Sequence, residues 1–281
     1  MTRRKSIQTV LTYLLLVCIG IVIIYPFLWL VGAAFHDTYA LEVNPRIIPK
    51  EPSLNGFING WKGAGVYTFG TYFKNTYVYV VLKVIFTVVS SLITAYGFAR
   101  FQFPFKKPLF SILISTLLFP AVVIIVPMYI LYSKIGWVDT YAPMLVPALF
   151  AGDTYFVYLL IQFFRSIPKD MDEAAMIDGC GPVGRLEKIL LPMMNTPIVT
   201  VMLFQFIWTG NDFMYPMIFL SSERKFPVSV GLKMFIDSSG ALISWANIFA
   251  MSFLAILPPL VVFLFAQSTF VEGISTSGLK G

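Results

Sequence analysis

The sequence has few of the residues that build metal centres, disulfide frameworks or soluble surfaces. Histidine occurs once, at His36, and cysteine twice, at Cys18 and Cys180. One cysteine lies in an apolar run and the other in a polar segment, so we expect neither a disulfide framework nor a metal centre. Charged residues make up 12% of the 281 positions, about half the share in soluble domains. Hydrophobic residues make up 58%, with a mean hydropathy of +0.80. This balance predicts an integral membrane protein.

Motifs for cofactor chemistry are also missing from the sequence. It contains no G-x-x-x-x-G-K-[ST] loop, whose backbone amides would bind the phosphates of ATP. It offers no nucleophile beside a base and no carboxylate dyad in a defined setting. The net charge is +6, but the basic residues stand mostly at the ends of apolar segments, which does not favour nucleic acid as a partner. We therefore predict a non-enzymatic chain that holds no cofactor.

Long apolar segments are what the sequence has in abundance. Each is near or above the ~20 residues that cross a bilayer as a helix, and none shows the two-residue alternation of a membrane barrel. They cover residues 10–32, 72–98, 108–132, 143–164, 193–220 and 241–268. We predict an all-α membrane protein with six transmembrane helices. The basic start of the chain resembles a signal peptide, but the first run exceeds an h-region of about 7–15 residues, which favours a retained span; Gly32-Ala33-Ala34 leaves cleavage open.

Lysine and arginine in the short loops predict the orientation of the chain. Basic residues gather before the first span, after the second and after the fourth, so these segments and both termini are predicted to be cytoplasmic. The basic loop at 221–240 is an exception. Residues 33–70 are polar and rich in Pro and Gly, and are predicted to form an external loop. The predicted divisions are 1–70, a core at 71–268 with a cytoplasmic loop at 166–192, and a cytoplasmic tail at 269–281.

The polar stretch 170–192 stands between two strongly apolar segments. Asp170 lies three residues before Glu173, a capping-box pattern that predicts a short helix beginning there. Gly179 is placed to end this helix, and Gly181-Pro182 to open a second one. Pro192 is expected to kink or start the next segment. A plain helical hairpin between two spans is the alternative to a functional element.

Seven residues of this stretch fit the pattern E-A-A-x3-G-x9-I-x-L-P of ABC importer permeases: Glu173, Ala174, Ala175, Gly179, Ile189, Leu191 and Pro192. Further segments resemble the carbohydrate importers of that family. Residues 72–98 resemble the start of its core, and 208–220 resembles W-N-D-F-x-x-P-x-I-F-L with Thr209-Gly210 inserted after the tryptophan. The end of the chain resembles F-V-x-G-x…G-x-x-K-G of maltose-importer-like permeases.

The resemblance implies a function and a set of partners. The stretch 170–192, with Asp178 beside the seven matching residues, would form the coupling helix that sits in a cleft of an ATP-hydrolysing subunit. The chain would form half of a pathway across the cell membrane with a second, similar permease. Two ATP-binding subunits would use ATP and Mg, and an external sugar-binding protein would deliver the substrate, with an oligosaccharide expected.

Polar residues inside the predicted spans are candidates for the substrate pathway. An ionisable group in the bilayer costs about 2.5–3.5 kcal/mol on insertion scales. Lys83 and Asp153 therefore line a path or pair with each other, or else Lys83 snorkels and Asp153 sits at a bend after Gly152. Asn211, Asp212 and Tyr215 suit sugar hydroxyls and ring faces, or else form interhelical hydrogen bonds.

Two rival functions remain open at this point. A secondary transporter or channel would show inverted repeats or a charged relay through several spans, and neither is visible. An ABC permease for a non-sugar solute is the other rival, and the C-terminal pattern argues against it.

Overall fold

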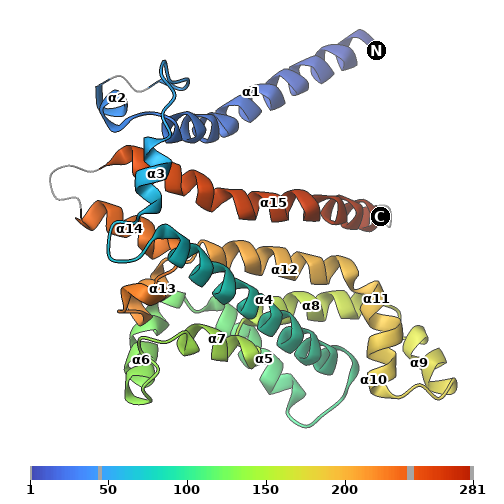
Figure 1. Cartoon of the computed structure of the whole chain (residues 1–281). Helices are drawn as coiled ribbons and strands as arrows, with labels where there is room; N and C mark the ends of the chain where they lie inside the picture. Colours follow the sequence, from blue (N-terminus) through green and yellow to red (C-terminus); the bar gives the residue numbers. More distant parts are fainter. Residues whose placement is uncertain (1, 44–45, 239–243, 279–281) are drawn as a thin grey trace. The chain divides into compact units, whose positions relative to one another are not determined.

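A computed structural model describes residues 2–43, 46–238 and 244–278, and over these residues the regular structure is helical (Figure 1). The chain divides into two compact units. Unit 1 comprises Met1–Thr71 and Gly231–Leu257, and unit 2 comprises Tyr72–Val230 and Pro258–Gly281. Each unit is described by itself below.

Unit 1 contains α1 (Thr2–Ala34), α2 (Thr38–Val43), α3 (Asn55–Trp61) and the first part of α15 (Trp245–Gly278). Helix α3 packs closely on α15. A Cβ atom at Gly56 would lie 2.7 Å from the Ala246 carbonyl oxygen, and one at Gly60 would lie 2.9 Å from Met251 Cγ. Glycines four residues apart share a helix face and let two helices approach. The prediction of an external loop at 33–70 therefore missed two short helices.

Helix α1 keeps its apolar side chains on the outside of unit 1. The leucine, isoleucine, valine and aromatic side chains between Val10 and Leu28 are exposed. Near the end of the helix, the Trp29 ring meets that of Phe249 edge to face, with centroids 5.0 Å apart. A helix of this length and apolarity is suited to a lipid environment.

Unit 2 is built around α8 (Thr154–Ser166), which packs against α5 (Lys106–Leu118) and α12 (Asn195–Gly210). The buried residues of α8 recur at helical spacing on one face: Phe156, Val157, Leu160, Ile161 and Phe164. This spacing gives α8 one continuous apolar stripe. The unbroken helix α4 (Phe69–Arg100) adds Val88, Ala95 and Tyr96 to the same core.

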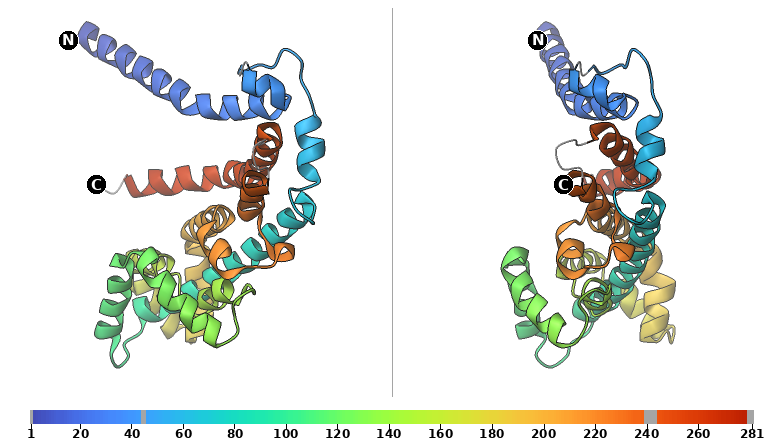
Figure 2. Two further views of the ribbon diagram at one scale, coloured as in Figure 1. Left: turned by 90° about the vertical axis from the view of Figure 1, so that its left-hand side faces the viewer. Right: turned by 60° about the vertical axis from the view of Figure 1, so that its left-hand side comes forward.

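Four helices are long and apolar enough to cross a membrane, and six spans are reached when each of two bent helix pairs counts as one. The predicted spans 108–132 and 193–220 are not single helices. In the first, α5 and α6 (Ala121–Lys134) meet at 108° (Figure 2). Pro120 has no N–H to donate and restricts Phe119 to an extended conformation, here φ −78° and ψ 125°. In the predicted span 193–220, α12 ends at Gly210, and α13 (Met214–Phe219) follows as a separate short helix.

The predicted span 143–164 corresponds to Ala142–Ser166, one of the four membrane-length segments, although a short break divides it. Helix α7 (Ala142–Leu149) stops before α8, and Ala151 adopts a left-handed φ of 57°. The Gly152 N–H donates to the Pro147 carbonyl oxygen at 2.8 Å. The two segments are so close that a Cβ atom at position 152 would lie 2.6 Å from that oxygen. This turn places Asp153 directly before α8. At the other end of the chain, α15 continues helically to Gly278, past the predicted start of a tail at residue 269.

Candidate functional site

A cavity of about 540 Å³ within unit 2 brings together four of the five predicted pathway residues. Lys83 reaches it from α4, and Asp153 from the break before α8. Asp212 comes from the break between α12 and α13, and Tyr215 from the first turn of α13. Asn211 instead follows the end of α12 with an exposed side chain. The cavity combines apolar walls with two carboxyl groups, one ammonium group and one phenol.

Asp153 is held by residues that sequence reasoning missed. Its Oδ2 atom accepts a hydrogen bond from Thr87 Oγ1 at 2.5 Å and another from Gln205 Nε2 at 3.2 Å. Among the residues that the structure describes, no ion pair joins Asp153 to Lys83, so the alternative in which the two pair is not the arrangement seen here. Two neutral donors satisfy the carboxylate and leave the Lys83 ammonium free of it. The bend after Gly152, the alternative for Asp153, is present.

Asp212 lies just before the short helix α13 and bonds to its first turn. Its Oδ1 atom accepts a hydrogen bond from the backbone N–H of Tyr215 at 3.3 Å, and its carbonyl oxygen accepts one from Ser229 Oγ at 2.8 Å. The first contact ties the orientation of this carboxyl to the start of α13. The break in the predicted fifth span therefore serves to present Asp212 and Tyr215 at the cavity.

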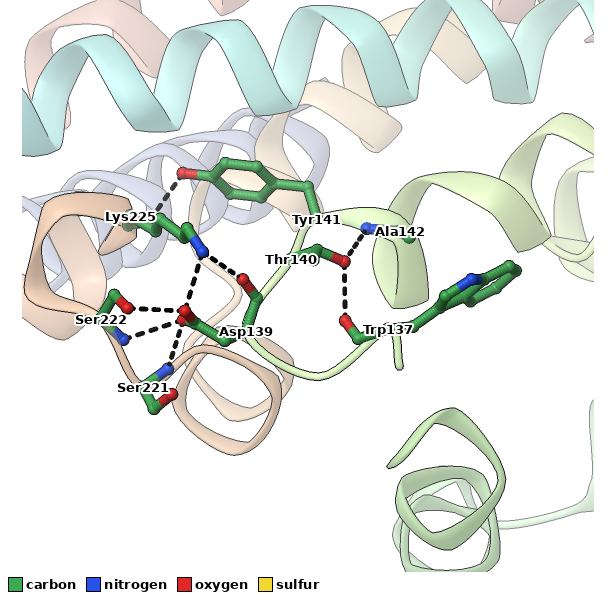
Figure 3. Close-up of polar contacts among 8 residues, drawn as sticks. All are labelled: Trp137, Asp139, Thr140, Tyr141, Ala142, Ser221, Ser222 and Lys225. Carbon is green, nitrogen blue, oxygen red and sulfur yellow. Dashed lines mark hydrogen bonds and ion pairs between the residues drawn. The ribbon is translucent and has the colours of Figure 1, made fainter. Parts of the chain in front are cut away.

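A cluster of polar contacts joins two loops of unit 2 around Asp139 (Figure 3). Its Oδ1 atom accepts hydrogen bonds from the backbone N–H groups of Ser221 and Ser222 at 3.0 and 2.9 Å. Its Oδ2 atom accepts from Ser222 Oγ at 2.6 Å and pairs with Lys225 Nζ at 2.8 Å. The Tyr141 hydroxyl donates to the Lys225 carbonyl oxygen at 2.6 Å. We call Asp139, Ser221, Ser222 and Lys225 the loop latch.

Burial alone would raise the pKa of the Asp139 carboxyl, but hydrogen bonds from Lys225, Ser222 and Ser221 outweigh it and hold this pKa well below its usual range. The ionised carboxylate is the form that accepts four such contacts. The latched segment is also fastened to α4. Asn75 Nδ2 donates to the carbonyl oxygens of Arg224 and Phe226, at 2.8 and 3.0 Å.

The coupling stretch, residues 170–192, forms two short helices around a glycine. Helix α9 (Asp170–Ile177) has Lys169 at its N-cap, so Asp170 lies inside the first turn and the predicted capping box is wrong. The helix itself begins at Asp170 as predicted, while Lys169 before it has backbone angles φ −70° and ψ −25° and makes no side-chain cap. Asp170, Asp172 and Glu173 still place negative charge in the first turn, where the helix dipole favours it.

Gly179 ends α9 as the sequence predicts. Its φ is 77°, the left-handed conformation that residues with a side chain adopt at a cost. The Gly179 N–H donates to the Met176 carbonyl oxygen at 3.1 Å, and the Cys180 N–H donates to that of Ala175 at 2.9 Å. These two bonds form a Schellman motif, which satisfies the last carbonyl groups of the helix.

The second helix opens at Gly181-Pro182, also as predicted. Gly181 is the extended N-cap of α10 (Pro182–Arg185), which continues into a π-helical turn, η1 (Leu186–Leu190), and then α11 (Leu191–Met193). The π-helical turn was not predicted. The direction changes by 77° between Pro182–Met193 and α12, at Met194, two residues after Pro192.

The motif residues of the coupling stretch divide into an outward and an inward set. Those with exposed side chains or backbone are Glu173, Ala174, Asp178, Gly179 and Pro192, while Ile189 and Leu191 are half-buried. Ala175 is 5% exposed and packs inside the chain. Ala174 is thus open to a partner surface, whereas a bulky residue at position 175 would first disturb the packing of this chain itself.

An ion pair fastens α9 to the end of α4. Arg100 Nε lies 2.9 Å from Asp172 Oδ2, with both side chains at least nine-tenths buried. The Arg100 guanidinium also donates from Nη2 to the Ile167 carbonyl oxygen at 3.0 Å. One turn earlier on α4, the Tyr96 hydroxyl donates to the Pro182 carbonyl oxygen at 2.9 Å. Helix α4 therefore contacts the coupling stretch on both sides of Gly179.

Several apolar membrane-length helices, a cavity with charged groups inside unit 2 and an exposed helical stretch define the class of a multi-pass membrane transport subunit. The family model of the binding-protein-dependent transport system inner membrane component matches residues 87–271, and the chain belongs to this family of ABC importer permeases. The match includes α8, the coupling stretch and α12.

Individual relatives match almost the whole chain. The trehalose/maltose transport system permease protein of Thermococcus litoralis is 26% identical over 99% of this chain and 99% of its own length. The sn-glycerol-3-phosphate transport system permease protein of Rhizobium meliloti is 25% identical over 98% of each. A chain in the crystal structure of a bacterial ABC transporter for the acidic polysaccharide alginate superposes with a TM-score of 0.82 at 22% identity, covering 95% of this chain and 97% of that one. This likeness confirms the predicted ABC importer permease fold.

Proposed function

We propose that this chain is one of two permease subunits of an ATP-driven, binding-protein-dependent sugar importer. A second, similar permease completes the pathway, two ATP-binding subunits use ATP and Mg on the cytoplasmic side, and an external protein delivers the sugar. The chain itself binds no cofactor. Family membership supports this assembly, and the cytoplasmic charge bias supports placing both termini and the coupling stretch inside.

The observation that carries the proposal is the form of the coupling stretch. Helix α9 holds Ala175 and Asp172 inward and leaves Glu173 and Ala174 exposed. Met176 and Ile177, next to each other on this helix, are 52% and 87% exposed. A small, rigidly capped helix with an acidic and apolar outer face fits a cleft on a partner protein. In our proposal, closure of the ATP-binding subunits moves this helix and so switches the access of the pathway.

The cavity favours a neutral sugar as the solute. Two carboxyl groups and one ammonium group line it, together with the phenol of Tyr215. Hydroxyl groups of a sugar suit these donors and acceptors, and its C–H faces suit the aromatic ring. An anionic solute would meet an excess of carboxyl oxygens. We therefore prefer a neutral oligosaccharide to the phosphorylated or acidic solutes named for some relatives and neighbours.

Uptake by the reconstituted complex tests the proposal. Vesicles that contain both permeases and the ATP-binding subunits should accumulate a neutral oligosaccharide only with ATP and the binding protein. Asp212→Ala should lower uptake while the complex still assembles, because the cavity loses a carboxyl group.

Three results would overturn parts of this proposal. Uptake without ATP would favour a secondary transporter or channel. Competition by a sugar phosphate but not by neutral sugars would favour the non-sugar rival. Disassembly of the Asp212→Ala complex in detergent would make Asp212 a packing residue.

A further inference from the structure

Helix α4 connects the coupling stretch to the cavity by side-chain contacts alone. At its C-terminal end, Arg100 pairs with Asp172 of α9. Further back on the same helix, Thr87 donates to Asp153, and Lys83 lines the cavity. A helix rises 1.5 Å per residue, so Thr87 stands about 20 Å from Arg100 along α4.

The covalent routes between the coupling stretch and the cavity are less continuous. Helix α8 begins next to Asp153 but ends at Ser166, and Ile167 is extended, with ψ 126°. On the other side, a π-helical turn inside the coupling stretch and a 77° bend after it separate α9 from α12. Helix α4 carries no proline between Phe69 and Arg100. A continuous helix moves as a rigid element, whereas extended links and bends absorb motion.

Arg100 contacts both the extended link between α8 and α9 and helix α9 itself. Its guanidinium donates to the carbonyl oxygen of Ile167, the extended residue between α8 and α9, and its charge faces Asp172 on α9. In the described part of the chain, the buried carboxylate oxygens of Asp172 accept no hydrogen bond of good geometry. The ion pair with Arg100 is therefore what offsets the cost of burying this charge. Removing one partner of such a pair leaves an uncompensated buried charge.

We infer that Arg100 is a positioning residue that locks the coupling helix to α4, so that movement of α9 displaces Lys83 at the cavity and Thr87, which holds Asp153. This inference rests on the proposed function of the coupling stretch. Arg100 is not expected to touch ATP, the ATP-binding subunit or the sugar. Its loss should therefore separate ATP hydrolysis from uptake rather than abolish hydrolysis.

The test measures sugar uptake and ATP hydrolysis side by side in the purified, reconstituted complex. Arg100→Gln should assemble and hydrolyse ATP but transport less sugar per ATP, by roughly 5- to 150-fold, the usual range of coupling between two sites. Arg100→Lys should keep part of the coupling, because an ammonium group preserves the ion pair. Arg165→Gln is the matched control. It removes an arginine from the last turn of α8, where the side chain stacks on Phe110 with Cζ 4.9 Å from the ring centroid. This variant should leave the amount of sugar transported per ATP unchanged.

A double variant keeps the test decisive if Arg100→Gln fails to assemble. Arg100→Gln with Asp172→Asn carries no buried unpaired charge at this point, so it should assemble and still be uncoupled. If either assembled variant transports as much sugar per ATP as the wild type, the role inferred for Arg100 is wrong and the proposed function stands. If the wild-type complex shows no ATP-dependent uptake, the proposed function fails instead.

Discussion

Two glycines of the coupling stretch provide a controlled test of its backbone conformation. Gly179 has a φ of 77° and Gly181 a φ of −69°, yet a Cβ atom added at either would meet nothing within 4 Å. Alanine at the two positions therefore differs in backbone strain and not in crowding. The left-handed conformation costs an L-residue roughly 1–2 kcal/mol, whereas the extended backbone of Gly181 is open to alanine without this strain.

The predicted difference affects the end of α9 and the direction of α10. A cost of about 1–2 kcal/mol reduces the population of the native turn relative to alternatives by roughly 5- to 30-fold. Gly179→Ala should thus lower ATP-driven uptake, while Gly181→Ala should match the wild type. Gly179→Asn should fall between them, because asparagine tolerates this conformation better than alanine.

The assay is uptake and ATPase activity of the purified complex, with expression in the membrane as a control for insertion. Neither glycine lies in a predicted span, so both variants should insert normally. Equal activity of Gly179→Ala and Gly181→Ala, at the wild-type level, would refute the role given to the left-handed turn.

Two other predictions concern unit 2. Asp139→Asn should lower the thermal stability of the complex by the same amount at every pH from 8 to 5, because the depressed pKa keeps the wild-type carboxylate ionised there. The stability that this carboxylate contributes is present above its unfolded pKa near 4 and is lost as the pH falls through its folded pKa. A difference in stability that already fades between pH 8 and 5 would contradict the loop latch. Gly152→Ala should destabilise the folded protein by about 1–3 kcal/mol, because its Cβ would lie 2.6 Å from the Pro147 carbonyl oxygen. Gly97→Ala, whose Cβ would meet nothing within 4 Å, is the control in the same thermal unfolding measurement. Equal unfolding midpoints for the two variants would show that the turn before Asp153 relaxes freely.

The parts of the fold that the sequence predicts well are those set by local chemistry. Long apolar runs mark the spans, and Gly179 and Pro182 mark the end of one short helix and the start of the next. Each signal acts within a few residues of itself. Pro120 is a similar local signal: it stands at the bend between α5 and α6 that divides the predicted span 108–132.

The partners in the site could not be predicted from one sequence. Asp153 bonds to Thr87 and Gln205, which lie 66 and 52 residues away along the chain. Charge alone suggested Lys83 as its partner, but a carboxylate is equally satisfied by neutral donors. Arg100 carried a loop-charge signal only, and its burial against Asp172 depends on how α4 meets α9.

Photocrosslinking from Ala174 tests most directly whether the coupling stretch contacts an ATP-binding subunit. A photoreactive amino acid at this exposed position should crosslink to the ATP-binding subunit in the assembled complex, with a yield that changes between ATP-bound and ADP-bound states. The same probe at Tyr13, 66% exposed on α1, should give no such product. A complex that transports sugar but shows no adduct of the ATP-binding subunit from position 174, or an adduct with the external binding protein instead, would contradict the proposed coupling.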